Sequence, residues 1–226
     1  MSKHRTQLPQ LSGDFFITDG GLETTLIFHD GLDLPEFASF DLLSHDTGKE
    51  TLRRYFRTYA AIARRNEVGF IFESATWRAS PDWADKLGYS TASLETMNRE
   101  AIELMDQVRS EFETDRCPVV ISGCVGPRGD GYRPEIQMTE QEAENYHAFQ
   151  VECFRQSAAD MVTATTMTHS EEAIGITRAS QKAGMPVVIS FTVETDGRLP
   201  TGQPVKEAIE QVDQATDTGP EYYMLN

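Results

Sequence analysis

Short apolar runs recur along the chain, each followed by polar turn residues and then by a segment whose apolar positions have helical spacing. The runs are rich in Val, Ile and Phe and show little alternation, which is typical of strands buried on both faces of a parallel sheet. Six strands are predicted, at Phe15–Thr18, Gly69–Phe72, Val119–Ser122, Met161–Ala164, Val187–Phe191 and Tyr222–Leu225. This βα alternation leaves two architectures, an open doubly wound sheet and a closed (β/α)₈ barrel.

The segments between the strands carry signals for helix starts and ends. Thr139 with Glu142 predicts a capping box, and Thr168 with Glu171 predicts a second one. Gly184 is suited to end the helix that the second signal begins. Two longer helices are predicted within Leu52–Arg65 and Leu94–Phe112.

The residues that follow each strand favour the barrel. A dinucleotide-binding sheet should carry Gly-x-Gly-x-x-Gly after its first strand, and residues 19–24 (Asp-Gly-Gly-Leu-Glu-Thr) lack that spacing. Polar or glycine-rich residues follow all six strands, which is typical of a barrel whose loops carry the function. A full barrel takes about 250 residues. We therefore expect residues 1–226 to form a single, incomplete barrel domain of about six βα units, without its seventh and eighth strands.

Composition excludes some classes of partner. The chain has 36 acidic and 20 basic residues, a formal charge of −16, which argues against nucleic acid and against anionic membranes as partners. No signal peptide and no apolar run of about 18 residues is present. Three cysteines, an odd number, favour a reducing compartment, so a cytoplasmic protein is expected.

Several strand-end residues carry possible chemistry, and each also has a plain structural reading. Asp19 with two following glycines can face an amine or present N–H groups to an anion, or can simply form a tight turn. The loop from Gly126 can approach a ligand closely, and Glu194 is a strand-end carboxylate beside a turn. Trp77 and Tyr132 can box a cationic methyl donor, or can serve as wall and core.

Taken together, the motifs resemble the homocysteine S-methyltransferase family. The matching segments, in order, are residues 19–24, 74–80, 122–127, 160–173, 190–194 with 199–202, and 224–226. The resemblance implies a (β/α)₈ barrel that transfers a methyl group to a thiol. It also implies a zinc ion held by three cysteine thiolates, with the substrate sulfur as the fourth ligand.

The resemblance further implies that strand-end residues hold the thiol substrate. Asp19 would face the substrate amino group, with Gly20 and Ser74 near its amino-acid end. The candidate substrate-binding residues are Asp19, Gly20, Ser74, Thr76, Gly126, Thr165, Glu194 and Asn226. The expected partners are a small-molecule thiol and a methyl donor, which can be a methyl sulfonium, a betaine or a methylated folate.

Two departures from the family pattern matter. Thr165 and Thr166 stand where the family usually has Glu-Thr, whose glutamate grips the substrate amine, so a thiol other than homocysteine is an open alternative. In the family the first zinc cysteine follows an asparagine that matches Asn226, so all three ligands are expected to lie outside this sequence. No catalytic residue or metal ligand is therefore assigned within the chain, and by itself it is expected to be inactive.

Two further readings stay open. The chain can be a non-catalytic, ligand-binding relative or an inactive fragment of the family. A zinc-free barrel lyase or aldolase would need a strand-end lysine to form a Schiff base, and none of the six predicted strand ends has one.

Overall fold

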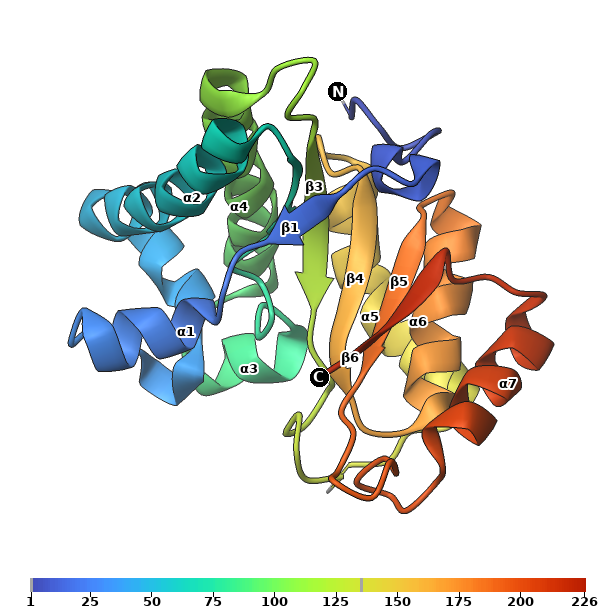
Figure 1. The fold of residues 1–226 in the computed structure, drawn as a ribbon. Helices are drawn as coiled ribbons and strands as arrows, with labels where there is room; N and C mark the ends of the chain where they lie inside the picture. Colours follow the sequence, from blue (N-terminus) through green and yellow to red (C-terminus); the bar gives the residue numbers. More distant parts are fainter. Residues whose placement is uncertain (1, 135) are drawn as a thin grey trace.

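Six parallel strands form one sheet, in the order in which they occur along the chain (Figure 1). The computed structural model describes residues 2–134 and 136–226. The strands are β1 (Phe16–Thr18), β2 (Gly69–Glu73), β3 (Val119–Val125), β4 (Met161–Met167), β5 (Val187–Phe191) and β6 (Tyr222–Leu225). All six predicted strands are thus confirmed, and their parallel order brings every carboxyl end to the same edge of the sheet.

Two strands are longer than predicted. The apolar pattern of β3 stops at Ser122 and that of β4 at Ala164, but pairing continues, with Cys124 opposite Thr163 and Val125 opposite Ala164. The ladder hydrogen bonds are made by the backbone, so small polar side chains within a buried strand do not interrupt them. The extra residues carry Cys124 and Thr165 to the site described below.

Helices connect successive strands and cover the outer face of the sheet (Figure 1). They are α1 (Leu22–Thr24), α2 (Asp46–Asn66), α3 (Pro81–Lys86), α4 (Thr91–Phe112), α5 (Glu140–Arg155), α6 (Ser170–Ala183) and α7 (Val205–Thr216). The main apolar core lies between them and the sheet, with Phe56, Phe72, Phe154 and Phe191 fully buried. The helix α2 begins at Asp46, six residues before the predicted range, because the N-cap His45 accepts a hydrogen bond from the Gly48 N–H at 2.9 Å.

The two predicted capping boxes have different outcomes. The first is confirmed at the start of α5, where Thr139 and Glu142 exchange hydrogen bonds between side chain and backbone. The second is wrong, because α6 begins one residue later and His169 is its N-cap. Extension of β4 through Met167 moves the start of the helix, so Thr168 belongs to the connection. Gly184 ends α6 as expected, with φ of 65°.

A smaller apolar cluster lies apart from the main core. It contains Leu8 from the amino-terminal segment together with one residue from each of four strands: Ile71, Val120, Met161 and Val188. Leu8 precedes a 3₁₀ turn at Pro9–Ser12. The amino-terminal segment therefore packs on the strands from the side opposite the helices. Among the described residues, no helix combines the length and the apolarity needed to cross a membrane.

Candidate functional site

A cavity of about 530 Å³ lies at the carboxyl ends of the strands. Five of the eight residues expected to bind substrate line it: Asp19, Gly20, Ser74, Thr165 and Asn226. Asp19 and Gly20 follow β1, Ser74 follows β2 and Asn226 follows β6, whereas Thr165 lies within β4, two positions before its end. Residues far apart in the sequence thus meet because the strands are parallel.

The other three expected residues lie outside the cavity lining. Thr76 is fully buried and donates from Oγ1 to the Cys124 carbonyl at 2.7 Å. The Gly126 N–H donates to the Trp77 carbonyl at 3.0 Å, so this glycine supports the wall rather than the lining. Glu194 is exposed in the turn after β5.

Asp19 is held at the end of β1 beside the aromatic residues of α2. The Tyr55 hydroxyl donates to the Gly20 carbonyl at 2.8 Å, and it lies against the Asp19 carboxyl. Burial raises the pKa of Asp19 to about 7, although the nearby Tyr55 hydroxyl and Glu73 backbone oppose the shift. The carboxyl therefore changes its charge near neutral pH.

Glu73, the last residue of β2, places a second carboxyl in the lining. Its Oε1 accepts a hydrogen bond from the Thr163 hydroxyl at 2.9 Å, and Thr163 is itself 2.7 Å from the Ser122 hydroxyl. Its Oε2 is buried and has no hydrogen-bond partner among the described residues. Burial, and after it the charge of Asp19, raises the pKa of Glu73 to about 8.

Glu23 is the third carboxyl of the lining, and it already has partners. The Ser39 hydroxyl donates to its Oε1 at 2.6 Å, and the cationic Arg78 faces it. The guanidinium of Arg78 stacks 3.9 Å from the Trp83 ring centroid and bonds to the Glu36 carbonyl, next to Phe37 of the lining. Burial raises the pKa of Glu23, and Ser39 and Arg78 oppose that shift.

Cys124 contributes a thiol to the cavity, with its Sγ 3.4 Å from the Thr165 hydroxyl. Burial, and next the charge of Glu73, raises the pKa of this thiol well above its ordinary value. A protonated thiol is a poor nucleophile and a poor metal ligand. Cys124 is therefore part of the wall, not an attacking group.

Aromatic side chains close one side of the cavity. The Trp77 indole N–H donates to the Thr166 hydroxyl at 3.0 Å, and Thr166 holds a left-handed φ of 60° at the end of β4. A non-glycine residue in that conformation is uncommon and is found where surrounding contacts maintain it. Tyr132 and Phe37 complete the aromatic side and are 59% and 47% exposed, so their rings are accessible at the mouth.

The residues present do not fit a metal ion. Across residues 2–134 and 136–226, no group of three His, Cys, Asp or Glu side chains is arranged to hold one. Cys117, Cys124 and Cys153 are buried and free, and they do not form such a group.

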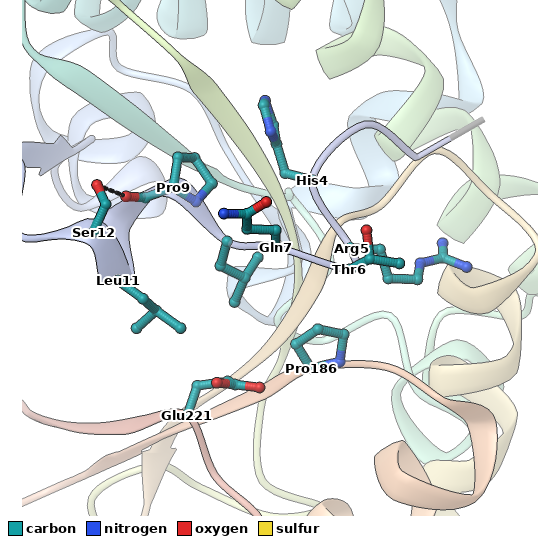
Figure 2. Close-up of a pocket in the computed structure, with 10 residues that line it drawn as sticks. His4, Arg5, Thr6, Gln7, Pro9, Leu11, Ser12, Pro186 and Glu221 are labelled. Carbon is teal, nitrogen blue, oxygen red and sulfur yellow. Dashed lines mark hydrogen bonds between the residues drawn. The ribbon is translucent and has the colours of Figure 1, made fainter.

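A second cavity of about 520 Å³ lies near the amino-terminal segment (Figure 2). The polar side chains that line this cavity do not point toward one common position where a ligand could bind. Arg5 points away from Glu221 in this view, and its guanidinium donates to the carbonyls of Arg155 and Ala159 at 3.0 and 2.7 Å. These bonds attach the amino-terminal segment to the rest of the fold, so we assign this cavity a structural role.

Sequence reasoning missed Glu73, Glu23 and Cys124. Glu73 had a usable signal, because it directly follows the apolar run of Gly69–Phe72 and so ends a buried strand. Glu23 and Cys124 lie within the family-matching segments 19–24 and 122–127, but a helical glutamate and a strand cysteine gave no sign of facing the cavity until the fold showed their positions.

Comparison with known proteins agrees with the family resemblance found in the sequence motifs. The sequence model of the family described as homocysteine S-methyltransferase matches residues 16–226. A selenocysteine Se-methyltransferase from Brassica oleracea var. italica is 24% identical over 229 residues, covering 90% of this chain. The chain spans 63% of the length of that curated relative.

Solved structures match over most of the chain. The homocysteine methyltransferase MmuM from Escherichia coli, in its oxidized form, has a TM-score of 0.79 at 18% identity and covers 96% of this chain and 75% of its own. Its metallated form has a TM-score of 0.75 at 16% identity, with 93% and 75% covered. The curled sheet of six parallel strands is therefore the incomplete barrel expected from the sequence.

Proposed function

The chain belongs to the homocysteine S-methyltransferase family, and on that premise we propose that it forms the amino-acid-binding part of an enzyme that transfers a methyl group to homocysteine or a related thiol. The observation that carries the proposal is the cavity at the strand ends, where Asp19, Gly20, Ser74, Thr165 and Asn226 meet. The selenol substrate in the name of the Brassica relative supports a soft, polarisable nucleophile as the acceptor class.

The residues of the cavity provide groups for each part of such a substrate. Asp19 offers a carboxylate to the substrate ammonium. Gly20 and Ser74 also line the cavity and offer backbone groups for the amino-acid end. The Ser74 hydroxyl is already engaged, because it accepts from the Cys124 N–H and bonds to the Thr76 hydroxyl. Thr165 supplies a hydroxyl beside Cys124, and no charge, where the family pattern has a glutamate. Of the substrate-binding residues expected from the sequence, we keep the five that share this cavity. Thr76 and Gly126 instead hold the wall of the cavity in place through their hydrogen bonds.

Zinc is proposed for the complete protein, as the group that would favour the thiolate form of the substrate at neutral pH. The described residues do not fit that ion, so we propose that the zinc ligands lie outside the part of the chain that the structure describes. The residues of this chain bind and orient the acceptor. The name of the metallated bacterial structure supports a metal in that relative.

The charge of the cavity favours a cationic methyl donor. Its lining has three carboxyls and no Lys, Arg or His, and Trp77, Tyr132 and Phe37 offer ring faces that attract cations. In the transfer, the substrate thiol first loses its proton to solvent, and the resulting thiolate sulfur forms a bond to the methyl carbon. The bond between that carbon and the donor's sulfonium sulfur or quaternary nitrogen breaks, and its electron pair leaves with the now neutral donor.

A ligand-binding protein without catalysis is the second candidate. The observation that favours it is the lack of a metal-binding group among the described residues. The two candidates predict the same binding and differ in turnover.

The test combines binding with turnover. The complete protein, including the residues proposed to bind zinc, is incubated with homocysteine and, in separate reactions, a methyl sulfonium, a betaine or a methylated folate, and mass spectrometry follows the methylated thiol. Product formation supports the enzyme, and homocysteine binding without product supports the binding protein. If the chain binds no amino-acid thiol by calorimetry, both candidates are rejected.

A further inference from the structure

The cavity at the strand ends lacks a positive charge to match its negative ones. Asp19, Glu23 and Glu73 line it, and no Lys, Arg or His does. Glu23 is engaged by the Ser39 hydroxyl and by Arg78. Asp19 and Glu73 are therefore the two carboxyls left to face a cation supplied by a ligand.

The hydrogen bonding of Glu73 indicates what kind of cation this is. Its Oε1 accepts from Thr163, whereas Oε2 is buried without a donor among the described residues. A buried acceptor without a donor is unfavourable, and a ligand that brings an N–H group would remove that cost. Sulfonium and quaternary ammonium ions have no N–H, so they cannot do so. A primary ammonium group has three.

We propose that Glu73 acts with Asp19 to hold the primary ammonium group of the acceptor amino acid, with Glu73 Oε2 as an acceptor. This inference rests on the proposed function and adds a specificity-determining residue to it. Glu73 would supply the charge that Thr165 does not.

The topology of the sheet places the two carboxyls together. Strands β1 and β2 are paired neighbours, with Thr18 opposite Ile71, so Asp19 and Glu73 leave the same edge of the sheet. The Asp19 carboxyl lies close enough to Glu73 for its charge to raise the pKa of Glu73. One ammonium group with several N–H donors can therefore bond to both carboxylates.

Binding of an ammonium group should release a proton. Burial raises the pKa of Glu73 to about 8 and that of Asp19 to about 7, and a nearby cation would lower both. The other titratable groups near Glu73 are the Cys124 thiol and the Tyr222 phenol, whose pKa values are raised by burial, so both stay protonated at neutral pH. Tyr55, beside Asp19, has a pKa raised by burial as well. The proton released near pH 7 thus comes mainly from the carboxyl pair.

The experiment compares three ligands by titration calorimetry near pH 7, in buffers of different ionisation enthalpy. Homocysteine has an amine and a thiol, 4-mercaptobutanoate lacks the amine, and 2-aminobutyrate lacks the thiol. The variant is Glu73→Gln, which keeps the size and an acceptor for Thr163. The matched control is Glu103→Gln, which removes one charge from an exposed position on α4.

We expect Glu73→Gln to weaken binding of both amines by about tenfold or more, because hydrogen bonds to charged groups are worth roughly that factor. Binding of 4-mercaptobutanoate should be unchanged, and proton release with homocysteine should fall. Glu103→Gln should match the wild type. Glu73→Asp, which keeps the charge, should restore part of the amine preference.

The opposite results separate the two claims. Equal amine affinity in Glu73→Gln and Glu103→Gln overturns the role of Glu73, and so does an equal loss for all three ligands, which would mean a purely structural role. A third result would separate the two claims in the other direction. If the chain binds 2-aminobutyrate in a way that depends on Glu73, but neither binds nor methylates a thiol, the role of Glu73 in ammonium binding is supported and the proposed function is rejected. If the wild type binds none of the three ligands, both fail.

Discussion

Asp19 combines a position at the end of β1 with a pKa that burial raises to about 7. If it faces the substrate ammonium, Asp19→Ala should raise the KM of the complete enzyme for the amino-acid thiol by roughly tenfold or more, because a charge-assisted hydrogen bond is lost. Steady-state kinetics with varied thiol concentration measure this effect. An unchanged KM would remove Asp19 from the binding site.

Thr165 is the residue that separates this chain from the family pattern. Thr165→Glu adds a carboxylate beside Cys124 in the cavity. We expect it to improve kcat/KM for homocysteine in the complete protein relative to a thiol without an amine, since a further anion attracts the ammonium group. Thr163→Glu is not a suitable control because Thr163 bonds to Glu73, so Thr165→Gln, equal in size and uncharged, serves instead. Equal gains from both variants would contradict the charge argument.

At the scale of elements, the loop after β3 is tightly fitted against Trp77. A Cβ at Gly126 would lie 2.3 Å from the Trp77 carbonyl oxygen, whereas one at Gly129 would meet only the Ile136 side chain at 3.6 Å. Gly126→Ala should lower the free energy of unfolding by about 1–3 kcal/mol, as expected for an overpacked site. It should also weaken substrate binding, because Trp77 forms the wall.

Gly129→Ala is the matched control for that prediction, and it should change the unfolding free energy by less than about 0.5 kcal/mol. Urea denaturation of both variants measures the difference. If the two variants are equally stable, the close packing of Gly126 against Trp77 does not constrain the loop.

At the scale of the whole molecule, the carboxyl pair of Asp19 and Glu73 links stability to pH. Asp19 and Glu73 have pKa values of about 7 and 8 in the folded protein, above those of exposed carboxyls. Between about pH 4 and pH 8 the folded state therefore binds more protons at these sites than the unfolded state does, and their contribution to stability falls as pH rises.

Glu73→Gln should accordingly reduce the loss of unfolding free energy between pH 5 and pH 8. Glu103→Gln, on the exposed face of α4, should leave the pH dependence of the wild type unchanged. Denaturant titrations at several pH values test this. Parallel profiles for all three proteins would show that Glu73 ionises freely.

The sheet has two outer strands, and this affects association. In the part of the chain that the structure describes, β1 pairs with β2 alone and β6 with β5 alone. Phe15, next to β1, is 73% exposed. Unpaired strand edges template association, while a net charge of −16 opposes it, so self-association should increase with salt.

Phe15→Lys should reduce that association, because a charged edge resists strand pairing. Phe28→Lys is the matched control, since Phe28 is 70% exposed but lies in the π-helical turn Thr25–His29, away from the edge. Analytical sedimentation at low and high salt measures the self-association of the two variants and the wild type, and only Phe15→Lys should lower it. A monomeric wild type with one sharp unfolding transition at all salt concentrations would contradict the expected edge association and loose packing.

The sequence alone determined the six strands, the parallel βα architecture and five of the residues that line the cavity at the strand ends. The apolar run of β5 was predicted to the residue, because an uninterrupted run is typical of a strand buried on both faces, as β5 is. The bounds of β6 were also predicted to the residue, although its residues are half-buried or exposed. Thr139 with Glu142 predicted the start of α5 because a capping box is a local interaction. Asp19, Ser74 and Asn226 were identified by motif and position.

Tertiary structure decided what depends on neighbours distant in sequence. The pairing of β3 with β4 extended both strands past their apolar runs and moved the start of α6 from Thr168. The tertiary structure also places Gly126 and Glu194 outside the cavity lining. The pairing of β1 with β2 brings Glu73 close to Asp19. Burial and a second carboxyl shift the pKa of Glu73, and neither can be read from its own segment, because desolvation and charge act through space rather than along the chain.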